Sequence, residues 1–288
     1  MRRTTILLLS VLLVVVPLAG CKKDAAEAPA AAKSLLDEIQ ERGVMRVGAE
    51  CLYKGTCYID PDTGERTGYS VDLANLMAQD LEVEIEWVDV EWSALIPAIE
   101  TGKADIIMMG MTNTPARAKV VEMSKPMDYY PGVLVMPADS PLHDLKTLDA
   151  ILSELNKPER TVTFLLGGAQ ERTIDLMLPD ATRRGLDMAA AYMEVASGRA
   201  DAMFVDAGDA ADMIQENPGG KIWNDEIVYT EHGSMVLRAG EQRFLNWINN
   251  WIDYYESRGT LRSLKIKWYD YRGIPEWMRA PPPGGATK

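Results

Sequence analysis

Short apolar runs alternate with segments of helical periodicity along most of this chain of 288 residues. Strands that alternate with helices build βαβ units, so the pattern predicts an α/β fold whose mostly parallel sheet is covered on both faces. The elements predicted for the first half are a helix at 35–42, strands at 44–48, 83–90 and 105–109, a hairpin at 58–69, and helices at 71–81 and 92–101.

The same alternation begins again in the second half, without a strict sequence repeat. Its predicted elements are a strand at 161–166, helices at 171–177 and 188–197, a strand at 201–205 and a helix at 207–215. The apolar runs 133–136 and 234–237 flank this second unit and are candidates for two strands that cross between the units. The chain would then return to the first unit for a predicted helix at 242–257 and for the segment 261–268.

The N-terminus predicts the compartment. Arg2 and Arg3 precede the apolar run 6–18, which is too short for a membrane span but suits the core of a signal peptide. The run ends in Leu18-Ala19-Gly20-Cys21, which resembles the lipobox of bacterial lipoproteins. The resemblance implies a signal peptide at 1–20, a lipid on the Cys21 thiol and a flexible tether at 21–34, hence an extracytoplasmic, membrane-anchored protein. Ordinary secretion is the alternative.

Net charge excludes one class of partner. The formal charge is −13, and removing the two cations of residues 1–20 leaves −15 for the remainder. Nucleic-acid binding depends on lysine and arginine that neutralise phosphates, so this composition argues against it. The chain has two histidines, His143 and His232, and no zinc spacing, and we expect no metal and no cofactor.

Three cysteines are present. If Cys21 carries lipid, Cys51 and Cys57 remain as an even pair in an oxidising compartment, and we expect a disulfide that stiffens residues 50–58. A metal site and a reactive thiol are the alternatives, although neither histidine lies nearby in the sequence.

The stretch 110–117, Gly-Met-Thr-Asn-Thr-Pro-Ala-Arg, follows an apolar strand as a predicted polar turn. Pro115 suits the first turn of a helix, and Arg117 would then project near the strand end. A hydroxyl at Thr112 and a guanidinium at Arg117 suit the capture of a carboxylate, because the planar guanidinium can donate two parallel hydrogen bonds. An ordinary surface charge is the alternative for Arg117.

Other polar and aromatic residues also follow predicted strand ends, where ligands bind in sheets of this kind. The residues placed in this way are Glu50, Trp92, Gly110 and Thr112. Asp206 ends the strand at 201–205 and precedes the helix at 207. Aspartate at such a position is a common N-cap, so capping and ligand contact both remain open for Asp206.

As a set, several short phrases resemble the bacterial extracellular solute-binding proteins of the polar amino-acid class, which feed ABC transporters. The phrases are Val47-Gly48, Gly68-Tyr69-Ser70-Val71-Asp72-Leu73, Leu95-Ile96-Pro97-Ala98, Gly102-Lys103-Ala104-Asp105, Gly110-Met111-Thr112 and Thr114-Pro115-Ala116-Arg117. A weaker likeness continues to about residue 272. The resemblance implies a two-lobed periplasmic-binding-protein (Venus flytrap) fold, in which two hinge strands join two α/β lobes. We expect lobe 1 at 35–134 plus 236–275, lobe 2 at 138–230 and a Pro/Gly-rich tail at 276–288.

The resemblance also implies roles for individual residues. Arg117 would clamp a ligand α-carboxylate with help from Thr112 and Gly110, and Asp206 would receive the α-ammonium. Trp92 and Tyr53 would form walls, and Glu50 would reach polar ligand groups. One departure concerns the second lobe, where Gly167-Gly168-Ala169 replaces a glycine followed by hydroxyl residues. Backbone N–H groups at Gly168 and Ala169 could still bind the carboxylate.

Three functions follow from this resemblance. The first is a monomeric solute-binding lipoprotein that delivers an amino acid or a related small zwitterion to an ABC transporter permease. The second is an enzyme that resembles cyclohexadienyl or arogenate dehydratases of the same fold, for which Glu50 is the one candidate general acid. The third is a ligand-sensing subunit for a membrane receptor. The sequence contains no Ser–His, Cys–His or metal constellation that favours catalysis.

Overall fold

The computed structural model describes residues 33–270, and every structural statement below concerns that range. The chain divides into the units Met1–Lys33 and Ser34–Lys288. The predicted signal peptide, Cys21, nearly all of the tether and the predicted tail lie outside the described residues. No helix within 33–270 is long and apolar enough to cross a membrane.

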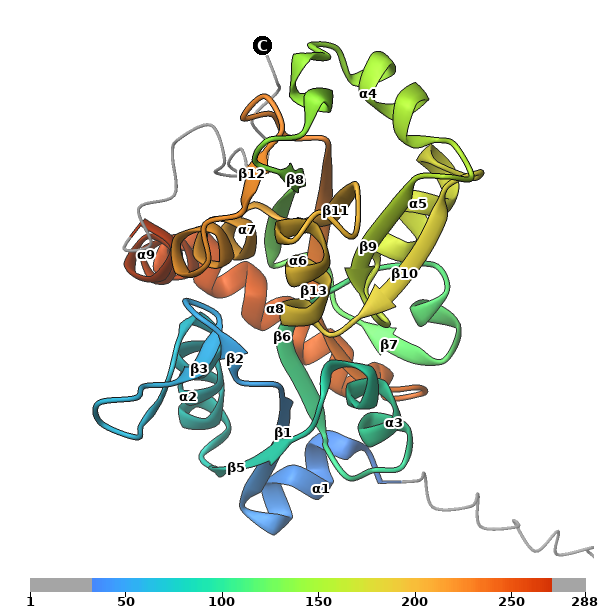
Figure 1. The fold of residues 1–288 in the computed structure, drawn as a ribbon. Coiled ribbons are helices and arrows are strands. Elements are labelled where there is room, and N and C mark those ends of the chain that lie inside the picture. The colour runs from blue at the N-terminus through green and yellow to red at the C-terminus, as the bar shows by residue number, and fades with distance from the viewer. Residues whose placement is uncertain (1–32, 271–288) are drawn as a thin grey trace, which may run out of the picture. The chain divides into compact units, whose positions relative to one another are not determined.

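Most strands join one mixed sheet of ten strands (Figure 1). Its main path runs through β10 (Thr182–Leu186), β9 (Thr161–Leu165), β11 (Ala202–Asp206), β8 (Asp128–Pro137), β13 (Tyr229–Arg238), β6 (Ile106–Thr112), β1 (Val44–Ala49) and β5 (Glu84–Asp89). β12 (Gly220–Ile222) pairs with β8, and β7 (Val121–Met123) pairs with β13. A smaller sheet contains β2 (Leu52–Tyr53), β3 (Cys57–Ile59) and β4 (Arg66–Thr67).

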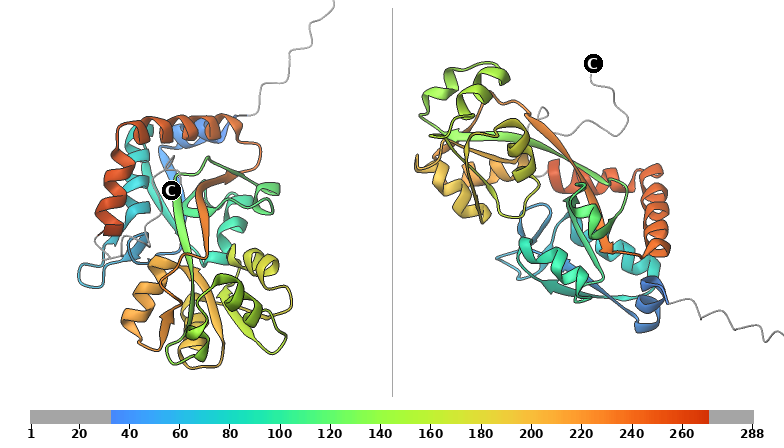
Figure 2. Two further views of the ribbon diagram at one scale, coloured as in Figure 1. Left: turned by 90° about the horizontal axis from the view of Figure 1, so that it is seen from above. Right: turned by 90° about the vertical axis from the view of Figure 1, so that its right-hand side faces the viewer.

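The helices divide between the two ends of this sheet. The end that contains β6, β1 and β5 carries α1 (Leu35–Arg42), α2 (Tyr69–Leu81), α3 (Leu95–Glu100), α8 (Gln242–Ser257) and α9 (Thr260–Lys265). The other end carries α4 (Leu148–Leu155), α5 (Gln170–Met177), α6 (Met188–Ala196) and α7 (Ala207–Glu216). Figure 2 shows α1 beside α8, so the chain returns at its C-terminal end to the half in which it began.

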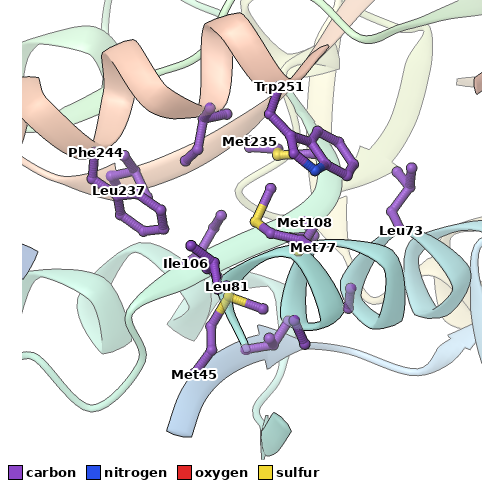
Figure 3. Close-up of a cluster of buried hydrophobic side chains, with 14 of the residues drawn as sticks. Met45, Leu73, Met77, Leu81, Ile106, Met108, Met235, Leu237, Phe244 and Trp251 are labelled. Carbon is purple, nitrogen blue, oxygen red and sulfur yellow. The ribbon is translucent and has the colours of Figure 1, made fainter. Parts of the chain in front are cut away.

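Each half of the sheet has a hydrophobic cluster on both faces. In the first half, one face holds Met45, Met77, Ile106, Phe244 and other side chains (Figure 3), and the opposite face packs on Leu95 and Ile99. The second half repeats this arrangement around β11 with two further clusters. Two lobes with separate cores are therefore present, as the family resemblance implied. The prediction of a mostly parallel sheet is wrong, because the central pairings of the shared sheet, β11 with β8, β8 with β13 and β13 with β6, are antiparallel.

The two long strands β8 and β13 connect the lobes. They pair with each other, antiparallel, through residues 128–132 and 229–233. Their later halves, which contain the predicted crossing runs 133–136 and 234–237, diverge: β8 pairs there with β11 and β12, and β13 pairs with β6 and β7. The connection between the lobes is thus formed just upstream of the runs selected for their hydrophobicity.

Most predicted elements are confirmed to within a few residues, and α8 has the predicted bounds. The polar turn predicted from residue 110 is wrong, because β6 continues to Thr112. A full helix after Pro115 is also wrong, since only the short 3₁₀ turn η2 (Arg117–Lys119) forms there. The sequence prediction missed α4 and β10; β10 is largely exposed and contains two arginines, so it has no apolar signal.

Candidate functional site

Arg117 is buried directly after the strand that was predicted to place it. It begins η2, and its relative exposure is 8%. Its Nη1 donates to the carbonyl of Thr112 at 2.8 Å, and its Nη2 donates to the carbonyl of Gly167 at 2.8 Å. Burial lowers the pKa of Arg117, and the charge of Glu231 opposes that shift. A surface role is therefore wrong, and the guanidinium is held by backbone oxygens from both lobes.

Trp92 shares one of these partners. It begins the 3₁₀ turn η1 (Trp92–Ala94), and its Nε1 donates to the carbonyl of Gly167 at 3.3 Å. The Cζ atom of Arg117 lies 6.0 Å from the centre of the Trp92 ring. One carbonyl in the turn between β9 and α5 thus receives hydrogen bonds from two residues of the first lobe. The sequence interpretation placed Gly168 and Ala169 at this position and did not include Gly167.

Tyr53 and Glu50 contact each other beside Trp92. The Tyr53 hydroxyl donates to Glu50 Oε2 at 2.6 Å, and the Tyr53 and Trp92 rings meet edge to face with centroids 6.2 Å apart. Burial and the bond to Glu50 raise the pKa of Tyr53, and the charges of Asp209 and Asp206 add to the rise. The predicted walls and the predicted acid therefore form one contiguous group with Arg117.

Glu231 is a buried acid that the sequence interpretation missed. It lies on β13 with a relative exposure of 7%, and its Oε2 accepts a hydrogen bond from Thr112 Oγ1. Burial raises the pKa of Glu231, while the Thr112 hydroxyl and the charge of Arg117 act in the opposite direction. A signal was available, because Glu231 shares a strand face with the buried residues Met235 and Leu237.

Asp206 ends β11 and occupies the N-cap position of α7, but its side chain makes no capping hydrogen bond to that helix. It is opposite Gly132 on β8, and Tyr229 of β13 is opposite the same glycine. A Cβ on Gly132 would lie 2.0 Å from the Tyr229 ring, so the ring covers the glycine. Burial and then the charge of Asp206 raise the pKa of Tyr229. Three adjacent strands thus bring Asp206 and Tyr229 together.

The predicted glycines have structural roles. Gly110 has a φ of +65°, and a Cβ there would lie 1.8 Å from the Tyr130 hydroxyl. The Gly168 N–H donates to the Leu165 carbonyl at 2.8 Å, so it closes the turn. Ala169 is the N-cap residue of α5, and the next residue, Gln170, is buried. The expectation that the Gly168 N–H binds a carboxylate does not fit this geometry.

The expected disulfide joins Cys51 to Cys57. It closes the loop that carries Tyr53 on β2, and Arg66 donates a hydrogen bond to Cys51 Sγ. The neighbouring Lys54 forms an ion pair with Glu216 of α7. The disulfide therefore stiffens a segment that contributes to the site and also contacts the second lobe.

Thiol counting tests the disulfide directly. We expect the denatured, unreduced domain of residues 22–288 to contain no free thiol at Cys51 or Cys57, because the structure joins their sulfurs. The reduced form should be less stable by about 2 kcal/mol, the loop-entropy value for so short a loop. Two titratable thiols before reduction would contradict the disulfide.

The site is rich in acids. The charges of four carboxylates raise the pKa of Tyr53 or of Tyr229, namely those of Glu50, Asp206, Asp209 and Glu231. The charge of Arg117 lowers the pKa of Glu231. Within residues 33–270 no group of His, Cys, Asp and Glu side chains could hold a metal ion. The arrangement offers one guanidinium for an anionic group and several carboxylates for cationic groups.

Comparison with known proteins identifies the family. The family model for bacterial extracellular solute-binding proteins, family 3, matches residues 45–271. The L-cystine-binding protein TcyJ of Escherichia coli K12 is 24% identical over 243 residues, which cover 82% of this chain and 86% of TcyJ. The L-arginine-binding protein of Pseudomonas aeruginosa is 25% identical over 237 residues, 79% of this chain and 88% of that protein.

Solved structures show the same fold. The ancestral amino-acid-binding protein AncCDT-1, described as a precursor of cyclohexadienyl dehydratase, is 36% identical with a TM-score of 0.71, covering 82% of this chain and 100% of its own. A mutant of ArgBP from T. maritima is 29% identical with a TM-score of 0.71, covering 82% of this chain and 99% of its own. These neighbours are two-lobed amino-acid-binding proteins.

Proposed function

Because this chain belongs to the bacterial extracellular solute-binding proteins of family 3, we propose that it captures an amino acid or a related small zwitterion between its two lobes and delivers it to an ABC transporter permease. One observation carries this proposal. A buried guanidinium, Arg117, is in one contiguous group with Trp92, Tyr53 and Glu50, and the charge of Asp206 reaches that group.

The proposed roles follow from charge and position. Arg117 would exchange its backbone carbonyl partners for the ligand carboxylate, which is the stronger acceptor for a guanidinium. Asp206 would receive the ammonium group, with Trp92 and Tyr53 against the ligand side chain. Gly110 and Gly168 would support the site through their backbone conformation. Lobe closure over the ligand would then present the loaded state to the permease.

The proposed location follows from the N-terminal sequence. We propose that cleavage before Cys21 and lipidation of its thiol anchor a monomer to the outer face of a membrane, with residues 22–33 as the tether. Mass spectrometry of the protein purified from membranes should find a lipid-sized mass increase on the peptide that begins with Cys21. An unmodified Cys21 in a secreted protein would contradict the anchor.

A thermal-shift screen of residues 22–288 tests the function. A ligand that binds only the native state raises the free energy of unfolding by about 2.7 kcal/mol when its concentration is 100 times Kd. The melting temperature rises accordingly. The screen contains amino acids, opines, polyamines, prephenate and arogenate. Stabilisation by one class of amino acid supports the proposal. Stabilisation by prephenate or arogenate alone, with formation of product, would instead identify an enzyme related in function to the descendants of AncCDT-1.

Asp206→Asn tests the ammonium site. We expect affinity for amino acids to fall by about 100-fold, because truncating one member of a buried charge pair costs about 2–5 kcal/mol and each 1.4 kcal/mol is tenfold. The measurement is calorimetric titration with the amino acid found in the screen. The matched control is Asp187→Asn, because Asp187 is also an N-cap residue and does cap its helix. Unchanged affinity in Asp206→Asn would leave Asp206 without a ligand role.

A further inference from the structure

We infer that Glu231 determines ligand specificity, and that its buried carboxylate makes the site select amino acids with a positively charged side chain over neutral ones. The inference rests on the proposed function, and it names the substrate class of the same site.

Glu231 is buried and is linked to Arg117 through Thr112. Its carboxylate is buried and accepts a hydrogen bond from the Thr112 hydroxyl. The carbonyl of the same Thr112 accepts a hydrogen bond from Arg117 Nη1. Thr112 therefore joins Glu231 to the guanidinium that would bind the ligand carboxylate. Among the ion pairs of residues 33–270, none joins Glu231 to Arg117 or to any other cation within 4.0 Å. The carboxyl group of Glu231 is thus buried beside the site without a direct counterion.

The charges of the site and of a neutral-side-chain ligand do not balance. A zwitterion with a neutral side chain brings one carboxylate for Arg117 and one ammonium for Asp206, and it leaves Glu231 uncompensated. Arg117 is the one described cation whose charge acts on Glu231, and it would already serve the ligand carboxylate. A buried, uncompensated charge is costly, so a ligand that supplies one further positive charge should be preferred.

Gln170 and Tyr229 add buried polar atoms that have no hydrogen-bond partner among the described residues. The Oε1 atom of Gln170 is buried and accepts no hydrogen bond from the described residues. The Tyr229 hydroxyl is likewise buried without a hydrogen bond from the described residues. Gln170 lowers the pKa of Tyr229, and the charges of Asp206 and Glu231 raise it, so all three residues lie near this hydroxyl. A guanidinium or ammonium group offers several donors and no acceptor, and therefore suits the surroundings of the Tyr229 hydroxyl, on which Gln170, Glu231 and Asp206 all act.

The groups around Glu231 define what else can titrate there. The Thr112 hydroxyl and the charge of Arg117 act on its carboxylate. Tyr229 lies two residues before it on β13, and Tyr130 is the residue opposite it on β8. His232, the next residue, points to the other face of the sheet, where its ring meets Tyr129. The carboxylates of Asp206 and Asp209 also act on Tyr229. The pH dependence is therefore assigned to Glu231 by comparing the wild-type protein with Glu231→Gln.

The test compares L-arginine with L-citrulline, which has nearly the same shape and no side-chain charge. At pH 8 we expect the wild-type protein to bind arginine at least about 30-fold more tightly than citrulline. Glu231→Gln should reduce this ratio of affinities by about tenfold or more, which corresponds to the lower end of the coupling energies of close charge pairs. Glu231→Asp, which keeps the charge, should retain a preference for arginine. Glu226→Gln, an exposed acid nearby in the sequence, should leave the ratio unchanged.

A pH series separates charge from structure. Between pH 8 and pH 5 the wild-type arginine-to-citrulline ratio should fall as Glu231 takes up a proton, and the ratio of Glu231→Gln should change less. Thr112→Val removes a hydrogen bond that stabilises the ionised carboxylate, so the wild-type fall should move to higher pH. This variant keeps the test available if Glu231→Gln does not fold, and an unmoved pH midpoint would then overturn the inference.

The outcomes distinguish the two proposals. If the wild-type protein binds neither arginine, citrulline nor any other amino acid, the proposed function fails. If it binds amino acids but accepts citrulline as well as arginine, or if Glu231→Gln keeps the full preference for arginine, the proposed function stands and the role of Glu231 is overturned.

Discussion

Arg117→Ala should abolish measurable amino-acid binding while the protein stays folded. Truncating one partner of a buried charge pair costs about 2–5 kcal/mol, which corresponds to a loss of affinity between about 30-fold and a few thousand-fold. The loss should be at the strong end, because Arg117 is buried and is the guanidinium in contact with Trp92. Calorimetric titration with the best amino acid from the thermal-shift screen gives the change.

Two controls isolate the guanidinium. Arg172→Ala removes an arginine of α5 whose side chain is 71% exposed, and it should leave affinity unchanged. Circular dichroism and the melting temperature of Arg117→Ala should show a folded protein, since the guanidinium itself contributes two hydrogen bonds to backbone carbonyls. Tight binding by a folded Arg117→Ala would remove Arg117 from the site.

Gly132→Ala should destabilise the protein by about 3 kcal/mol, at the upper end of what overpacking a core costs. Three atoms of the Tyr229 ring lie 2.0–2.3 Å from where the new Cβ would be, and the ring stacks on Phe204, so it cannot easily move away. For a domain of this size the expected fall in melting temperature is about 6–12 °C. Denaturant unfolding and calorimetry measure both quantities.

A double mutant identifies the cause. Gly132→Ala combined with Tyr229→Ala should cost less than the sum of the two single changes, because the added methyl group has no ring to meet. Gly48→Ala is the matched control, because Gly48 is also a strand glycine. A Cβ added there would lie 3.3 Å from its nearest neighbour, the Cβ of Ala104. Additive costs for Gly132 and Tyr229 would show that the ring does not cover the glycine.

Much of the fold follows from patterns that the sequence displays locally. α8 could be predicted to its ends because its apolar residues, among them Phe244, Ile248 and Trp251, repeat at helical spacing. β10 could not, because Thr-Arg-Arg-Gly-Leu carries no apolar alternation and is a strand through its pairing with β9. The same limit explains β6, whose last residues look like a polar turn but are held by pairing with β13.

The candidate site divides in the same way. Arg117, Asp206, Trp92 and Glu50 could be selected because each follows a strand, where local chemistry and family likeness agree. Glu231, Gln170, Tyr229 and the Gly167 carbonyl could not be assigned, because their partners are distant in sequence. The bond from Thr112 to Glu231 spans 119 residues, and the bond from Trp92 to Gly167 spans 75.

The sequence by itself determined most of the secondary structure, the repeated α/β pattern and the residue types available for binding a zwitterion. These depend on short-range periodicity and on side-chain chemistry, both of which can be read within a window of a few residues. The tertiary structure decided which of those residues meet, and it placed Asp206, Gly132 and Tyr229 in one row of three strands. Register between distant strands arises from packing and backbone pairing across the whole chain, so the acid beside Arg117 became visible only in the folded molecule.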